Sequence, residues 1–445
     1  MSYKRMAPVV LLLLALAGTG LAQQAQTPGD APLRLTLKEA VRLALLQNPM
    51  VILANLDVSQ AAEDRLVARS GLLPQAGGGT SETRHRYNLP AQLGIPFAGF
   101  PEHVGPFNVF QVGIGVDAPL FDLTLWRRYQ GSKLGVEASR AGERTAREAS
   151  VLLVVSQYLG TQRALAETSA AQSRVELAAA LYDQAADLQK NGVGTGIDTL
   201  RANVELQNEK QRLIVARTQL ETSLFALARL LSVDPQRKVE LADGTGFFET
   251  PGISLDQTIA QAYVARPELK QISTEQARAE LALKAAGEAK LPKVSFSGFW
   301  VEQGLAPNSV IPVYQYQANL EFPLFYGGLI QAEQAKADLA IRQLHQKEVE
   351  TRNRIALEVK TAVAQLDAAR GEVEVANLGV QLSKQEVEQA RDRFQAGVAN
   401  NIEVISAQDS LARASDNQIA ALYRFNQARA DVAHSMGQME AAYGK

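Results

Sequence analysis

The residues with the most specific chemistry are few and scattered in this 445-residue chain. Its four histidines show none of the paired spacing that metal ligands require: His85, His103, His345 and His434. The absence of cysteine excludes disulfides, thiolate metal sites and cysteine nucleophiles. The glycine-rich segment 192–196 lacks the spacing and the preceding strand of a dinucleotide-binding loop, and no Gly-x-Ser-x-Gly motif occurs. The sequence therefore predicts no enzyme and no cofactor, and its function must come from its architecture.

Residues 1–22 have the character of a secretion signal. Lys4 and Arg5 precede a leucine-rich stretch, and small residues up to Ala22 are typical of a cleavage site. We expect a mature chain that begins near Gln23, with an uncleaved anchor as the alternative. A lipid anchor on an N-terminal cysteine is excluded, because the chain has no cysteine.

Charge and hydropathy limit the partners. The net charge falls from −2 to −4 when the leader with its two basic residues is removed, so the basic excess of a nucleic-acid binder is missing. No apolar run after the leader approaches the length of a membrane-spanning helix. Any membrane crossing must therefore be made of β-strands, since in lipid only helices and closed barrels satisfy all backbone groups.

The chain contains an internal duplication. Four motifs occur in the same order in both halves. The pairs are Leu35–Ala40 and Ile253–Thr258, Asn48-Pro49 and Arg266-Pro267, Ala118–Phe121 and Phe322–Phe325, and Asn191–Val193 and Ala396–Val398. The offset between copies shrinks from 218 residues to 204 or 205 in the stretch between Pro74 and Pro119. We expect a variable outer loop there, at residues 88–107.

Each half predicts the same elements: a short helix, a β-hairpin and a long helix pair. The first repeat takes residues 23–250, with its hairpin at about 75–121 and its helix pair at about 133–232. The second takes residues 251–440, with its hairpin at about 293–325 and its helix pair at about 327–437. Thr36 and Glu39 predict a capping box at the first helix, and Asn48-Pro49 predicts an interruption of it.

Two nine-residue segments carry a membrane signal. In 110–118 and in 314–322, apolar residues alternate with polar residues or glycine, and nine to eleven tilted residues cross a bilayer. Residues 293–300 alternate more weakly, and residues 75–87 are glycine-rich and mostly polar. A half-buried strand of a soluble protein is the alternative for each single segment. Four of them in two repeated hairpins favour a membrane barrel.

The helix pairs are long and carry a seven-residue repeat. Residues 133–190 contain no proline, and as one helix they would span roughly 85 Å, so this helix should protrude. Apolar residues recur every seventh position, which indicates coiled-coil packing, with Gln418 as the one polar exception. They are Leu206, Leu213, Leu220 and Leu227, then Val404, Leu411, Phe425 and Val432.

Four strands cannot close a barrel, because the smallest membrane barrels need about eight. An open sheet edge in lipid leaves backbone groups unsatisfied, so transmembrane strands here require an oligomer.

The duplicated Leu-Thr-Leu-Lys-Glu-Ala start, the Pro-Leu-Phe strand ends and the Gly-Val breaks between long helices together resemble the TolC family of outer membrane efflux proteins. The resemblance covers about residues 33–440. It implies an α + transmembrane β fold: a homotrimer whose four strands per subunit form a twelve-stranded barrel, continued by a periplasmic α-helical barrel. It also implies contact with outer-membrane lipid, and two partners, a periplasmic adaptor and an inner-membrane transporter.

The resemblance assigns roles to the turns between the long helices. The adaptor-docking tips would be Gly192, Val193, Gly194, Thr195, Gly397 and Val398. Helix C-caps are the alternative for these glycines. Glu403 matches a family position where acids constrict the duct, Asp198 is its counterpart in the first repeat, and three such carboxylates around an axis would attract cations. Ser406 stands where a second acid is often found, and Ala399 where an arginine often bridges the gate, which indicates a looser gate. Acids in a first helical turn also complement the helix dipole, and that is the alternative role for both.

The sequence thus predicts a passive exit duct in the outer membrane, serving a tripartite efflux or type I secretion system. A periplasmic coiled-coil adaptor or scaffold that never inserts is the alternative function. The alternation in 110–118 and 314–322 discriminates between them, because a scaffold has no need of it.

Overall fold

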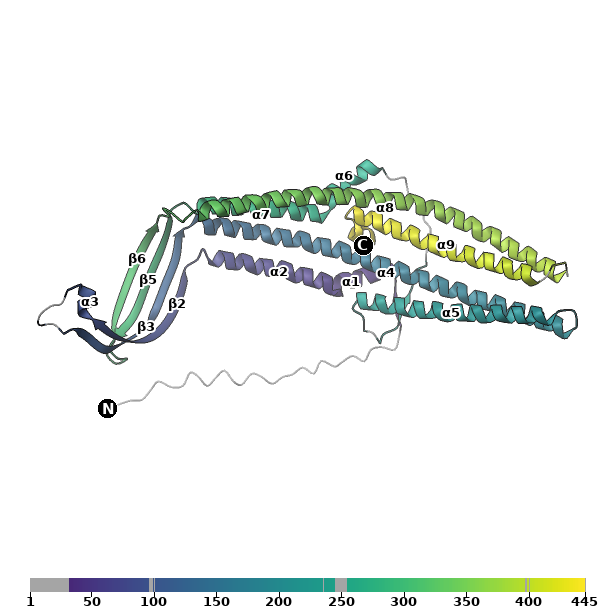
Figure 1. Ribbon diagram of the computed structural model, residues 1–445, viewed down its shortest axis with the longest axis horizontal. Coiled ribbons are helices and arrows are strands. Elements are labelled where there is room, and N and C mark those ends of the chain that lie inside the picture. The colour runs from purple at the N-terminus through teal and green to yellow at the C-terminus, as the bar shows by residue number, and fades with distance from the viewer. Residues whose placement is uncertain are drawn as a thin grey trace.

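The computed structural model describes residues 32–95, 99, 101–234, 236–244, 254–396, 398–399 and 401–444. This part of the chain is elongated: a β-sheet forms one end, two tight turns form the other, and long helices run between them (Figure 1). The predicted secretion signal, residues 1–22, lies outside the described residues.

The sheet has four antiparallel strands in the order β2-β3-β5-β6. They are β2 (Gln75–Asn88), β3 (His103–Phe121), β5 (Lys293–Gly304) and β6 (Ile311–Glu321). Each repeat supplies one hairpin, and β3 pairs with β5 where the repeats meet. Within the described residues, β2 and β6 are therefore the edges of this sheet.

The two faces of the sheet differ in polarity. Ile114 lies opposite Trp300, and Trp300 opposite Tyr314, and all three side chains are about half exposed or more. One face therefore presents apolar and aromatic groups to its surroundings. Asp117, Ser297 and Gln317 form the corresponding row on the other face. The predicted strands at 110–118 and 314–322 are confirmed, except that β6 ends at Glu321, one residue before Phe322.

The segment predicted as a loop, 88–107, is partly regular. It contains α3 (Leu89–Leu93), whose N-terminus is capped by the Asn88 side chain accepting from the Ala91 amide at 3.0 Å. β3 already begins at His103. The loop prediction was therefore too long, because a five-residue helix and the start of a strand carry no clear period.

In the described part of the first repeat, four helices accompany α3. They are α1 (Leu37–Gln47), α2 (Pro49–Ser70), α4 (Leu123–Lys190) and α5 (Gly196–Leu230). The capping box of Thr36 and Glu39 is confirmed, and so is the interruption at Asn48. α4 begins ten residues before the expected start at 133, because Asp122 caps it by accepting from the Thr124 amide at 2.8 Å.

The described part of the second repeat contains five helices. They are α6 (Leu255–Ala265), α7 (Pro267–Glu288), α8 (Leu329–Gln395), α9 (Asn401–Ser435) and α10 (Met439–Tyr443). Two short parallel strands, β1 (Leu33–Leu35) and β4 (Val239–Leu241), lie beside the helices of the first repeat. α4 and α8, of 68 and 67 residues, form the shaft of the molecule (Figure 1).

The main core lies at mid-shaft. α1, β1, β4 and α10 pack there on α4 around Tyr158, which is fully buried and donates its hydroxyl to the Leu35 carbonyl at 2.9 Å. Most of the seven-spaced residues are buried: Leu206, Leu213, Leu227, Val404, Phe425 and Val432, of which Leu227 is part of this core. In the described part of the chain, no helix combines the length and apolarity needed to cross a membrane.

Candidate functional site

The turn between α4 and α5 depends on two glycines for different reasons. Gly192 has φ +74°, a conformation that costs glycine little, and the amides of Val193 and Gly194 bond the Leu188 carbonyl at 3.0 and 2.9 Å. Gly194 leaves no room for a side chain, since a Cβ there would lie 2.9 Å from the Gln189 amide nitrogen. The turn is therefore tight, and its amides satisfy the carbonyls of Asp187, Leu188 and Gln189 near the end of α4.

The second turn, between α8 and α9, closes in the same way. The amides of Val398 and Ala399 bond the Arg393 carbonyl at 3.0 and 3.3 Å. Gly397, which the sequence places in the docking tip, lies outside the described residues. The two turns lie at the same end of the shaft, far from the sheet (Figure 1).

Both turns expose large apolar side chains. Val193 is 79 % exposed and Val398 is 70 % exposed, and Ile197 and Ile402 are each about half exposed. An isolated exposed valine needs no explanation, but the same Val–Ile pair at the same place in both repeats marks a surface suited to a protein partner.

The predicted gate acids stand beside these turns, each held by a basic residue. Asp198 lies in the first turn of α5, accepts from the Thr195 hydroxyl and has Arg201 Nη1 at 3.9 Å. Glu403 lies in the first turn of α9, and its Oε1 is 2.9 Å from Nε of Arg393 near the end of α8. The Glu403 pair therefore bridges the α8–α9 turn, whereas the Asp198 pair stays within α5.

Ser406 is exposed on α9, one turn after Glu403. The structure thus brings Glu403 together with Arg393, a residue that the sequence reasoning did not select. The signal was available: Arg393 is the last basic residue before the turn, and cations near a helix C-terminus also complement the helix dipole.

A buried charge cluster in the shaft also escaped the sequence reasoning. Glu209 on α5 is only 4 % exposed, and it is paired with Arg212 and, at 3.4 Å, with Nε of Arg174 on α4. Arg174 also binds Asp416 on α9 at 2.9 Å and so links the two helix pairs. Three residues after Leu206, Glu209 lies on the core stripe of the seven-residue repeat, where an acid is unexpected.

The same cluster perturbs its neighbour Glu205. Burial, followed by the carboxylates of Asp409 and Glu209, raises the pKa of Glu205 above its ordinary value. A cavity of about 280 Å³ lies between α4, α5 and α9 at this height. Among the described residues, no group of three or more histidine or acidic side chains is placed to hold a metal ion.

The sheet with one apolar face, the long shaft and the paired turns define a protein that inserts at one end and meets partners at the other. The family model "Outer membrane efflux protein" matches residues 40–233 and 258–438, and the chain belongs to this family. A search of curated proteins gave no match.

Solved structures show the same fold. The CmeC outer membrane channel of Campylobacter jejuni is 21 % identical with a TM-score of 0.78, and the match covers 90 % of this chain and 85 % of that one. CusC is 17 % identical with a TM-score of 0.76, covering 93 % and 95 %. The MtrE outer membrane channel of Neisseria gonorrhoeae, in its open state, is 18 % identical with a TM-score of 0.74, covering 90 % and 88 %.

Family membership confirms the predicted family, fold class and location. The chain is an outer-membrane channel of an export system, with its sheet in a trimeric barrel and its helices in the periplasm. It works as a homotrimer with a periplasmic adaptor and an inner-membrane transporter, and the alternative of a non-inserting scaffold has no support. The family is one of transport channels rather than of enzymes.

Proposed function

We propose that the α4–α5 and α8–α9 turns are the docking and gating end of this efflux duct. The observation that carries the proposal is the repeated combination at both turns: an exposed valine and isoleucine beside an acid held by an arginine. The apolar pair supplies a surface for the adaptor, and the acid supplies charge at the mouth.

The lateral edges of the chain indicate how copies join. Near the sheet the helices follow the order α2-α4-α7-α8, and near the turns the order α5-α4-α9-α8. One edge of the chain is thus β2, α2 and α5, and the other is β6 and α8. The sheet, the helices near it and the helices near the turns thus share the same two sides of the chain. Joining one side to the opposite side of the next copy at every level therefore closes a ring.

These edges carry apolar groups without a partner in the single chain. On α5, Ile214, Val215 and Phe225 are each more than 60 % exposed, and on α8 Leu357 and Val375 are also. Burying such groups between copies is favourable, at about 25 cal/mol per Å² of apolar surface. We assign them to the contact between subunits, which leaves the turns as the surface for the adaptor.

Transport through the duct is passive in this proposal. The acids at the turns make an electrostatic filter in the mouth, where Glu403 and its two symmetry copies would favour cations. Release of the Arg393–Glu403 bridge loosens the α8–α9 turn and is the step that opens the mouth. Catalysis has no part in it, because the energy is supplied by the inner-membrane transporter.

Docking is tested by Val193→Asp combined with Val398→Asp. A charge in each apolar tip should abolish cross-linking to the adaptor, at unchanged amounts of trimer in the outer membrane. Val264→Asp is the matched control, because Val264 on α6 is 89 % exposed but far from the turns. Normal cross-linking by the tip variant would overturn the docking role.

Gating is tested by single-channel recording in planar bilayers. Glu403→Ala should weaken cation preference and, by freeing Arg393, raise the open probability. Glu388→Ala, which removes an exposed acid on α8, is the control. Ion selectivity and open probability equal to those of the unaltered channel would remove Glu403 from the gate.

A further inference from the structure

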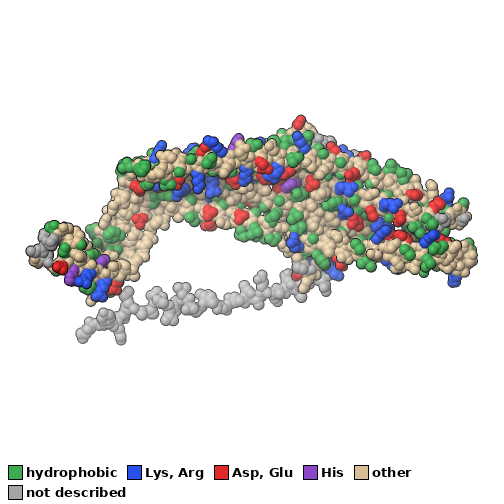
Figure 2. Space-filling model, in the orientation of Figure 1, with side chains coloured by type: hydrophobic (Ala, Val, Ile, Leu, Met, Phe, Trp, Pro, Cys, Tyr) green, Lys and Arg blue, Asp and Glu red, His purple; other side chains and the backbone are tan. Residues whose placement is uncertain are grey.

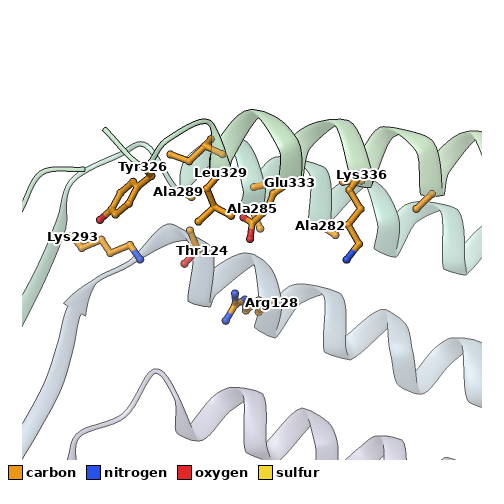
Figure 3. A pocket seen from close by; sticks show the side chains of 14 residues that line it. Thr124, Arg128, Ala282, Ala285, Ala289, Lys293, Tyr326, Leu329, Glu333 and Lys336 are labelled. Carbon is orange, nitrogen blue, oxygen red and sulfur yellow. The ribbon is translucent and has the colours of Figure 1, made fainter. Parts of the chain in front are cut away.

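A groove of about 570 Å³ lies where the sheet joins the helices, bounded by α4, α7 and α8 (Figure 3). Its floor is one face of α7 with its C-cap, where four alanines recur at helical spacing: Ala282, Ala285, Ala286 and, at the cap, Ala289. The small side chains leave depth between the neighbouring helices, and they make the floor apolar. The size is that of sites for small organic molecules, which occupy about 300–1,000 Å³.

Basic residues from three different elements line this groove. Arg128 comes from α4, Lys293 from the start of β5 and Lys336 from α8, with Glu333 as the one acid of the lining. Figure 3 shows Lys293, Glu333 and Lys336 extending toward the same space as Arg128. The groove is therefore positively charged around an apolar floor.

Two of these cations are uncompensated. Nζ of Lys293 lies 3.4 Å from Oδ2 of Asp122, so Lys293 is already paired. Arg128 and Lys336 make no ion pair or hydrogen bond with any residue that the structure describes. They are the groups available to a negatively charged ligand.

The register of β5 places Lys293, one of the lining residues, on the inner side of the duct. Lys293 shares one face of the strand with Ser295 and Ser297, whereas Val294 and Phe296 point to the other face. Phe296 stacks on Tyr316 of the apolar, lipid-facing side of the sheet. The polar face is the lumen face of a membrane barrel, so a molecule moving along the lumen passes the groove.

We propose that this groove is a binding station for organic anions on their way out: carboxylates or sulfonates carried on an apolar body. The apolar body lies on the alanine floor, and the anionic group lies between Arg128 and Lys336. This inference rests on the proposed function as an export duct, and it names a class of cargo for it.

The position of the groove gives the station a role. The turns carry acids that favour cations, whereas the groove at the other end of the helices is lined by three basic residues and one acid. In the trimer, three such grooves raise the local concentration of anionic cargo at the entrance to the barrel, because a basic concave surface attracts anions. Cargo that is weakly held here returns less readily toward the periplasm.

The test is equilibrium dialysis of the full-length trimer in nanodiscs of phosphatidylcholine, with naphthoate as the anionic probe. Naphthyltrimethylammonium is the cationic probe of similar shape. We expect saturable naphthoate binding that weakens with salt, and much weaker binding of the cation. Arg128→Gln combined with Lys336→Gln should weaken naphthoate binding about tenfold or more, because hydrogen bonds to charged groups are stronger than those between neutral groups.

The control is Lys284→Gln combined with Lys360→Gln, which removes the same charge from exposed positions of α7 and α8 outside the groove. Equal losses in both double variants, or equal binding of the two probes, would overturn the proposal. Displacement of naphthoate by phosphatidylglycerol, with the same dependence on Arg128 and Lys336, would reassign the groove to a lipid headgroup and also overturn it.

This measurement is independent of the tips, since it needs neither an open mouth nor an adaptor. If naphthoate binding depends on the groove but the Val193/Val398 variant docks normally, only the docking proposal is overturned. If that variant fails to dock but the unaltered trimer binds no naphthoate, only the proposal for the groove is overturned.

Discussion

The two repeats bend their short helices at equivalent places but hold the bend with different chemistry. Asn48-Pro49 joins α1 to α2, and Arg266-Pro267 joins α6 to α7. Each bend is tied to the end of the returning long helix. Asn48 Nδ2 donates to the Leu230 carbonyl at 2.9 Å, and Arg266 Nη1 donates to the His434 carbonyl at 3.0 Å.

The joint at Asn48 needs no further side chain to satisfy its polar groups, whereas the joint at Arg266 does. Asn48 also accepts from the Met50 amide at 2.8 Å and thereby caps α2. Arg266 has no acceptor, so α7 begins without a side-chain cap. The buried guanidinium instead requires Glu268 and Glu358, at 2.8 and 3.0 Å. Duplication has thus kept the geometry of the bend, while the second repeat has made it depend on a buried charge network.

The largest expected difference between the joints comes from removing their central side chains. Arg266→Met should lower the free energy of unfolding by about 3 kcal/mol, because it removes a buried guanidinium and leaves the partly buried Glu268 and Glu358 without their partner. Asn48→Ala should cost only about 1 kcal/mol, the usual value of a lost cap. Guanidinium titration of the trimer in detergent, followed by circular dichroism, measures both. A smaller loss for Arg266→Met than for Asn48→Ala would contradict the comparison.

The helix ends beside the joints should respond in opposite directions. Both α5 and α9 are followed, two residues after their last helical residue, by a left-handed residue: Ser232 with φ 52° and Gly437 with φ 68°. Gly437→Ala should destabilise by about 2 kcal/mol, since the left-handed conformation costs about 1–2 kcal/mol and its Cβ would lie 3.3 Å from Cα of Arg266.

Ser232→Gly is the matched variant in the first repeat. It should stabilise by about 0.5 kcal/mol, because relief of the left-handed strain slightly exceeds the entropy that glycine loses on folding. Thermal unfolding of the two variants side by side provides the measurement. Destabilisation by Ser232→Gly would show that the two helix ends are not equivalent.

The smallest effect is a pH dependence confined to the second joint. Burial, and then the charge of Arg266, lower the pKa of His434; Glu358, Glu268 and Asp431 face it with the opposite influence. Between the lowered pKa and the ordinary value near 6.5, the unfolded chain binds more protons than the folded chain. In this window the free energy of unfolding therefore rises with pH, and acidification lowers it.

His434→Gln should flatten that slope between about pH 7 and pH 5. Asn48→Ala should leave it unchanged, because the Asn48 side chain does not titrate. The midpoint of thermal unfolding, recorded at several pH values, is the readout. Parallel slopes for the His434 variant and the unaltered protein would exclude the histidine as the titrating group.

Much of the fold could be predicted from local signals. The alternation in 110–118, the capping box at Thr36 and the break at Asn48 are each decided by a few neighbouring residues, and all three are confirmed. The start of α4 was misplaced although Asp122 is a good cap, because the following residues lack a clear apolar period. α3 was missed since five residues are too few to show a period.

The site was less accessible to sequence reasoning. The turns were found through their glycines, and their exposed valines follow from that position. Arg393 and the Glu209–Arg174 pair were missed because a charged side chain finds its partner through space: Arg174 meets Glu209 and Asp416 from two other helices. The docking and gating roles of the tip residues remain predictions for the experiments above.

The sequence by itself determined the duplication, the order of elements, the alternating strands and the placement of the turns, because these depend on spacing along the chain. Tertiary structure alone decided which distant groups meet: Arg266 with the end of α9, and Arg128, Lys293 and Lys336 around the alanines of α7. The physical reason is that period and capping are local properties. Burial, ion pairing and the shape of a groove depend on helices and strands that the chain brings together only when it folds.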